Sequence, residues 1–175
     1  MPKTQAPYIP QKRSEFTADW FSDCLQEQFG AAVLDVDLEI IGTGVGFIGE
    51  VYRCKLSWDA TRGDLPQSVI IKVPSSIPAN RGLGEGMQLY EREVLAYQKL
   101  SSGMALPMPK LFYATMDDDP TPWLDKVIDF LFTYLPVRAV SWATVQFLKL
   151  AGNNPRLRRY LLMIEDIVDA RPPSQ

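Results

Sequence analysis

Three glycines and a lysine are the residues of this sequence best suited to do chemistry. Gly44, Gly46 and Gly49 follow the spacing G-x-G-x-x-G, and Val51 adds an apolar residue two positions later. Glycines let the main chain come close to a phosphate group and turn its N–H groups toward it. Lys72, at the end of the next apolar run, supplies a cation for phosphate oxygens. The sequence therefore predicts a nucleotide phosphate site, with Val51 as an apolar ceiling over a flat base.

The residues after the glycines distinguish between two nucleotide-binding architectures. A dinucleotide-binding fold needs its glycines to open a helix. Residues 50–56 instead alternate between polar and apolar side chains and are rich in strand formers, which predicts a half-buried strand. Two strands around a glycine loop, and a further strand that ends in lysine, are typical of a kinase-type phosphate-binding loop. An NAD-binding domain is disfavoured, and a glycine-rich hairpin beside a surface lysine is the plain alternative.

The elements that must position these residues are strands of one sheet and a helix before them. Apolar residues near alternate positions predict strands over 33–41, 49–58 and 68–73. Pro74 ends the third strand because proline cannot donate to a sheet ladder. A helix over 16–29 precedes them, with Thr17 as its N-cap and Gly30 as its stop. Residues 75–86 hold a proline and three glycines and are expected to form a loop.

A helix over 87–100 carries two glutamates that could pair with Lys72. Such a pair would hold the lysine in place beside a phosphate. Glu93 is the candidate and Glu91 the alternative, because they point about 200° apart on a helix and only one of them can face the sheet. A solvated acidic helix face is the interpretation without function.

The second half of the chain adds two strands and a helical region. Strands are expected over 110–115 and 160–167, and the acidic turn 117–119 is expected to be a solvated loop rather than a site for a divalent ion. Residues 122–159 are predicted to form a helical hairpin. We expect the hairpin to pack on the body of the protein. A lid or docking surface, or shallow membrane association, are the alternatives.

Composition narrows the function classes. The 175 residues include no histidine, which excludes catalysis by histidine triads or by a histidine base in this chain. A net charge of −3 argues against a nucleic-acid-binding surface. The lack of a long apolar run or signal peptide, and two cysteines without metal-site spacing, favour a cytoplasmic protein. Residues 1–15 are expected to be a flexible arm.

In their order, these segments resemble the aminoglycoside phosphotransferase and choline-kinase-like family, and most of all its ecdysteroid-kinase-like branch. The resemblance is carried by the glycine loop and by residues 69–72, 90–94, 107–110 and 162–167. It implies an α+β fold: a protein-kinase-like N-terminal lobe with an antiparallel sheet and an αC-type helix. The implied parts are the lobe at 16–121, a helical insertion at 122–159, and the last strand and hinge at 160–175.

The resemblance also implies roles for individual residues. Lys72 would contact the ATP phosphates, and Glu93 would hold Lys72. Val51 and Ile70 would line the adenine pocket, and the main chain of the hinge would meet the adenine edge. The residues expected to bind ATP are Gly44, Gly46, Phe47, Gly49, Val51, Ile70, Lys72, Glu93, Glu165, Asp166 and Ile167.

The chain departs from the family pattern in what it lacks. Enzymes of this family carry a catalytic aspartate and the metal-binding asparagine and aspartate in a helical C-terminal lobe. The sequence stops just after the expected hinge, so we expect no catalytic residue or Mg²⁺ ligand in it, and negligible turnover by this chain alone. The parent protein would transfer a phosphoryl group from ATP to a hydroxyl of a small acceptor molecule. The alternative is a non-enzymatic nucleotide-binding or protein-interaction module.

The glycine loop yields a first test. Gly46→Val is expected to weaken ATP binding, because a β-branched side chain would block the approach of the main chain to phosphate. Isothermal titration calorimetry with ATP measures the effect. An unchanged affinity would remove the loop from the site.

Overall fold

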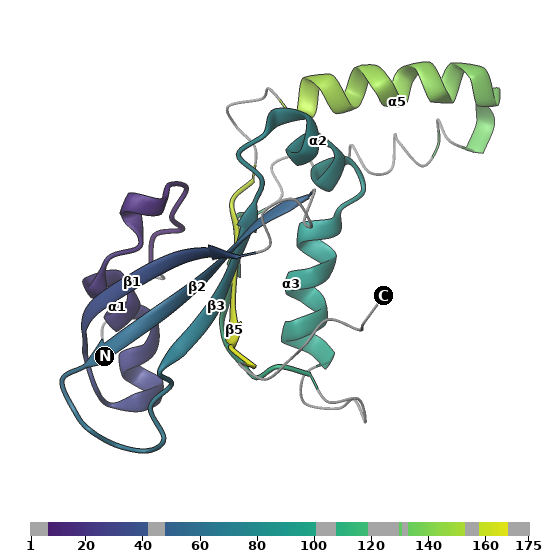
Figure 1. Cartoon of the computed structure of the whole chain (residues 1–175). Helices are drawn as coiled ribbons and strands as arrows, with labels where there is room; N and C mark the ends of the chain where they lie inside the picture. Colours follow the sequence, from purple (N-terminus) through teal and green to yellow (C-terminus); the bar gives the residue numbers. More distant parts are fainter. Residues whose placement is uncertain are drawn as a thin grey trace, which may run out of the picture.

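Five strands form one antiparallel sheet, which is the frame of the molecule (Figure 1). The computed structural model describes residues 7–41, 48–100, 108–118, 130, 133–152 and 158–167. The strands are β1 (Val33–Ile41), β2 (Gly49–Trp58), β3 (Ser68–Pro74), β4 (Leu111–Met116) and β5 (Tyr160–Glu165). Their order across the sheet is β1-β2-β3-β5-β4. The chain therefore has the predicted α+β class, and β3 lies at the centre of the sheet.

The five strands lie close to where alternation of apolar residues predicts them. β1 and β2 have the predicted bounds, β3 and β4 each extend one residue further than expected, and β4 also begins one residue later. β5 is apolar from Tyr160 to Ile164 and buried along that whole run, because it is paired on both sides by β3 and β4. It ends at Glu165, two residues before the predicted end.

The helix α1 (Ala18–Phe29) covers one face of the sheet (Figure 1). Its ends are those predicted: the Thr17 side chain accepts a hydrogen bond from the Trp20 N–H at 3.3 Å, and Gly30 stops the helix in the left-handed conformation, at φ 62°. Phe21 and Leu25 are fully buried in a core that includes alternate residues of β2, β3 and β5. Burial of this apolar stripe is what attaches α1 to the sheet.

The helix α3 (Leu89–Leu100) covers the opposite face, against β4 and β5. It begins two residues later than predicted. A second, smaller cluster lies under it, formed by Ile70, Leu162 and Ile164 with Val51 and Tyr97 packed against them. We call this side of the sheet the α3 face.

Residues 75–86 are not the expected loop, because most of them form the helix α2 (Pro78–Gly86). Pro78 occupies the first turn, where its missing N–H costs nothing. The glycines suggested a loop, but Gly82 and Gly84 are buried, and a side chain at Gly84 would overlap the ring of Tyr90. The glycines therefore let α2 pack closely on its neighbours.

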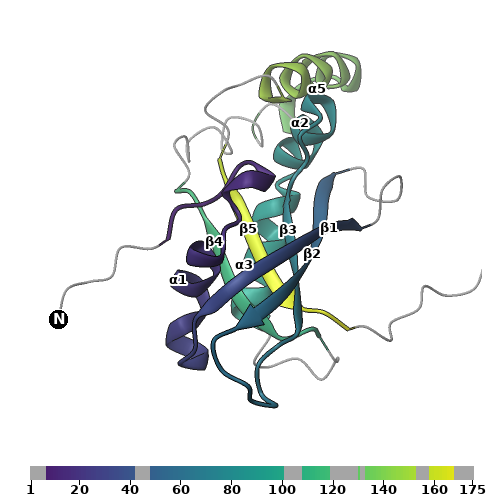
Figure 2. The same cartoon turned by 60° about the vertical axis from the view of Figure 1, so that its left-hand side comes forward.

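A further helix, α5 (Val137–Gly152), packs beside α2 at the end of the molecule away from the α1 core (Figure 2). It is the second helix of the predicted hairpin. Most of the first helix lies outside the described residues. Among the described residues, no helix combines the length and apolar character that crossing a membrane requires.

The flexible arm is also wrong for its second half, since residues 8–15 pack on the α1 side of the molecule (Figure 2). Ile9 and Pro10 are buried, and the Trp20 indole N–H donates to the Tyr8 carbonyl at 2.7 Å. A short 3-10 turn, η1 (Arg13–Glu15), then leads into α1. Prolines suggested flexibility here, but Pro10 contributes apolar surface to the core.

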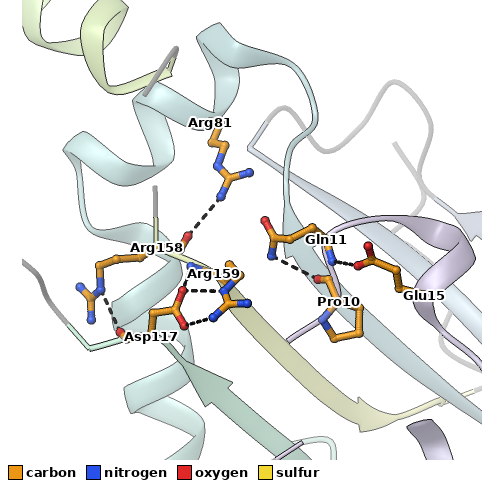
Figure 3. A network of polar contacts seen from close by, with 7 residues as sticks. All are labelled: Pro10, Gln11, Glu15, Arg81, Asp117, Arg158 and Arg159. Carbon is orange, nitrogen blue, oxygen red and sulfur yellow. Dashed lines mark hydrogen bonds and ion pairs between the residues drawn. The ribbon is translucent and has the colours of Figure 1, made fainter. Parts of the chain in front are cut away.

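A network of polar contacts joins the end of β4 to the start of β5 (Figure 3). Both carboxylate oxygens of Asp117 accept from the Arg159 guanidinium at 2.8 Å, and the Arg159 N–H donates to the same carboxylate at 2.9 Å. Arg158 donates to the Asp117 carbonyl at 3.1 Å, and Arg81 of α2 donates to the Arg158 carbonyl at 3.1 Å. Asp117 is thus a structural ion-pair partner, not the solvated turn residue predicted.

The network makes stability depend on acid. Hydrogen bonds from Arg159 hold the pKa of the Asp117 carboxyl below its usual value. A lowered folded-state pKa adds stability above the unfolded value of about 3.9, and this stability is lost as pH falls through the folded pKa. Asp117→Asn should therefore destabilise the protein near neutral pH, and the difference from wild type should shrink between about pH 4 and pH 2.

Urea unfolding at a series of pH values measures this difference. The matched control is Asp118→Asn, at the exposed neighbouring position, which should leave the pH dependence of stability as in wild type. A difference for Asp117→Asn that does not change with pH would contradict a role for its charge.

Candidate functional site

Lys72 and Glu93 form an ion pair on the α3 face of the sheet. Lys72 lies near the end of β3 and Glu93 in the middle of α3, and the Lys72 Nζ to Glu93 Oε1 distance is 2.6 Å. The two side chains remain 35% and 40% exposed. The predicted pairing is therefore present. Glu91, the alternative, instead accepts from Arg158 at 2.8 Å.

Strand register places Val51 beside Lys72. Val51 of β2 and Leu162 of β5 lie directly opposite Lys72, so the three side chains share the α3 face. Ile70, two residues earlier on β3, lies on the same face opposite Ile164. Val51 and Ile70 thus come together as predicted, although Ile70 is only 8% exposed and offers little open surface.

Asp166, at the predicted hinge, is held by two residues of the central strands. Its carboxylate accepts from the Arg53 Nε at 2.8 Å, from a second Arg53 nitrogen at 3.2 Å, and from the Ser68 hydroxyl at 2.6 Å. The Asp166 side chain is 3% exposed. The hydrogen bonds to Asp166 raise the pKa of the Arg53 guanidinium, so the arginine stays charged.

The other two hinge residues lie at the surface. Glu165 is exposed, its N–H donates to the Lys110 carbonyl at 2.8 Å, and its carboxylate accepts from the Lys110 N–H at 3.1 Å. Ile167 is exposed. The predicted hinge is therefore tied to the sheet through Asp166 and Glu165, and none of its residues contacts Lys72 directly in the pairs described.

A cavity of about 480 Å³ lies between the first half of α3 and the sheet, next to the Lys72–Glu93 pair. Its size falls within the range of about 300–1,000 Å³ typical of small-molecule sites. Four residues predicted to bind ATP line it: Gly49, Val51, Lys72 and Glu93. Ile70 and the hinge do not line it.

Gly49 has a reason to be glycine that phosphate approach does not explain. A Cβ atom at this position would lie 2.9 Å from the Val73 carbonyl oxygen on the neighbouring strand. Gly49 is thus required for close pairing of β2 with β3. Gly44, Gly46 and Phe47 lie outside the described residues.

The sequence did not single out Tyr90, which closes the inner end of the cavity. Its hydroxyl donates to the Ile48 carbonyl and accepts from the Ser75 N–H at 3.4 Å. Tyr90 thereby connects α3 to the chain just before β2 and just after β3. The available signal was its position three residues before Glu93, which places both residues on the same side of a helix.

Arg53 and Ser68 were also not predicted. Arg53 follows Val51 by two positions and Ser68 precedes Ile70 by two, so alternation alone puts all four on one face. Their convergence on Asp166 depends on strand order, which alternation does not reveal.

Metal ligands are not gathered in this region. Within the ranges that the structure describes, no group of three or more histidine, cysteine, aspartate or glutamate side chains is placed to hold a metal ion.

Comparisons with protein-family models, curated proteins and solved structures give no match to this chain.

The exposure of the Lys72–Glu93 pair predicts a small contribution to stability. Exposed ion pairs contribute about 0–1 kcal/mol because water screens both charges. Glu93→Gln should therefore change the free energy of unfolding in urea by less than about 1 kcal/mol.

Glu91→Gln is the matched control on the same helix. It should cost more, because Arg158, which pairs with Glu91, is only 12% exposed and would be left with a more deeply buried charge. A loss above about 2 kcal/mol for Glu93→Gln would show that the pair is mainly structural.

Proposed function

We propose that this chain is the ATP-binding lobe of a phosphotransferase that acts on a hydroxyl group of a small molecule. The proposal rests mainly on the Lys72–Glu93 ion pair at the mouth of the cavity. A half-exposed pair adds little to folding, so its value lies in where it places the ammonium group. The five-stranded antiparallel sheet with α3 on one face is consistent with the kinase-like lobe that the sequence resemblance implies.

In this proposal each residue has a limited task. Lys72 attracts the oxygens of the α- and β-phosphates, and Glu93 keeps the ammonium in one position on a rigid strand. Val51 and the glycine loop cover the nucleotide from the β1–β2 side. Because Lys72 donates to Glu93 in the absence of nucleotide, ATP would bind to a group that is already oriented.

The described residues do not fit a Mg²⁺ site, since no cluster of oxygen ligands is present among them. The proposal therefore assigns nucleotide binding to this chain and no step of phosphoryl transfer. The acceptor molecule and a cytoplasmic location belong to the same proposal.

A non-enzymatic interaction module is the second candidate, favoured by the exposed apolar residues of α5. Val137 and Trp142 are both exposed on this helix. Nucleotide binding is compatible with both candidates. A native polypeptide in the source cells well above 19.7 kDa would favour the phosphotransferase, and one at 19.7 kDa would favour the module.

Calorimetry with ATP tests the nucleotide site. Lys72→Ala should weaken ATP binding about tenfold or more, because a hydrogen bond to a charged group contributes about 1.5–3 kcal/mol. Lys55→Ala is the matched control, since Lys55 lies on β2 in an exposed pair with Asp37. Absence of ATP binding by the wild-type chain, or equal losses in both variants, would overturn the proposal.

A further inference from the structure

The side chain and the main chain of Asp166 face different surroundings. The residue as a whole is half-buried, while its side chain is only 3% exposed. The surface that Asp166 presents to solvent is therefore mostly main chain. Among the described residues, the pairing of β5 with β3 extends to Glu165 and no further, so Asp166 lies just past the ladder.

The Asp166 carboxylate is held on the same face of the sheet as Lys72. Arg53 lies opposite Ile70, and Ser68 and Lys72 alternate with it along β3, so all of these side chains belong to the α3 face. Ser68 and Lys72 are four residues apart, which is about 13 Å along a strand. An extended adenosine phosphate spans such a length, with its phosphates at Lys72 and its base near Asp166.

The ion pair has a geometry suited to fixing a direction. Two Arg53 nitrogens donate to the two carboxylate oxygens, and Ser68 donates to one of them, so the carboxylate can neither rotate nor move without breaking several bonds. Buried ion pairs are often neutral for stability compared with apolar residues, and their best-attested role is to specify one arrangement. Here that arrangement is the path of the chain as it leaves β5.

We propose that Asp166 is a positioning residue for the base of the nucleotide. Arg53 and Ser68 clamp its carboxylate and thereby hold the main chain of residues 166–167 where its N–H and C=O groups can meet the adenine edge. This inference rests on the proposed ATP-binding function. It adds that base recognition and phosphate recognition depend on two separate ion pairs, Arg53–Asp166 and Lys72–Glu93.

Two ligands separate these contributions in calorimetry: ATP, and inorganic tripolyphosphate, which has no base. Asp166→Ala should weaken ATP binding about fivefold, the loss of one or two hydrogen bonds to the base, and leave tripolyphosphate affinity unchanged. Ser68→Ala keeps the Arg53–Asp166 pair and should have a smaller effect in the same direction. Lys72→Ala should weaken binding of both ligands.

Asp37→Ala is the matched control for Asp166→Ala. It removes a carboxylate from the exposed pair with Lys55 and should leave both affinities unchanged. Circular dichroism and thermal unfolding report whether each variant is folded. If Asp166→Ala does not fold, Ser68→Ala decides: a selective loss of ATP affinity supports the inference, and no selective loss overturns it.

The possible failures are distinguishable. If the wild-type chain binds neither ATP nor tripolyphosphate, the proposed function fails and the inference fails with it. If Lys72→Ala weakens ATP binding but Asp166→Ala affects both ligands equally, or neither, only the inference is overturned.

Discussion

The position of β3 between β2 and β5 is the constraint on which the rest of the structure depends. Because side chains alternate along a strand, one register decides that Ser68, Ile70 and Lys72 share a face while Val69 and Ile71 enter the α1 core. A shift by one residue would bury the ammonium of Lys72 in an apolar core and expose the valine and isoleucine. The large core under α1 therefore also keeps the candidate site correctly oriented.

Two ion pairs lie at opposite ends of the α3 face and differ in their surroundings. Lys72–Glu93 is half-exposed and free to exchange partners with an anionic ligand. Arg53–Asp166 buries its carboxylate and holds it with three hydrogen bonds. Water screens the first pair and is excluded from most of the second. The same chemistry thus serves a replaceable contact at one end and a permanent one at the other.

The helix α3 connects the site to the far end of the molecule. Glu93 reaches Lys72, Glu91 reaches Arg158 beside α2, and Tyr90 contacts the segments that flank β2 and β3. One helix thereby sets both the orientation of the lysine and the place where α2 and α5 pack. Any displacement of α3 along the sheet would change all three contacts together.

Sequence alone determined the strands, α1 with its caps, and the choice of Glu93 as a partner for Lys72, because these follow from local alternation and helical spacing. It did not reveal α2, the docking of residues 8–15, or the pairing of Asp117 with Arg159. Glycine, proline and acidic residues suggested loops there, and packing against distant segments overrode those preferences. The clamp on Asp166 likewise needed the tertiary structure, because Arg53, Ser68 and Asp166 are separated by up to 113 positions. Strand order, which no local pattern encodes, brings them together.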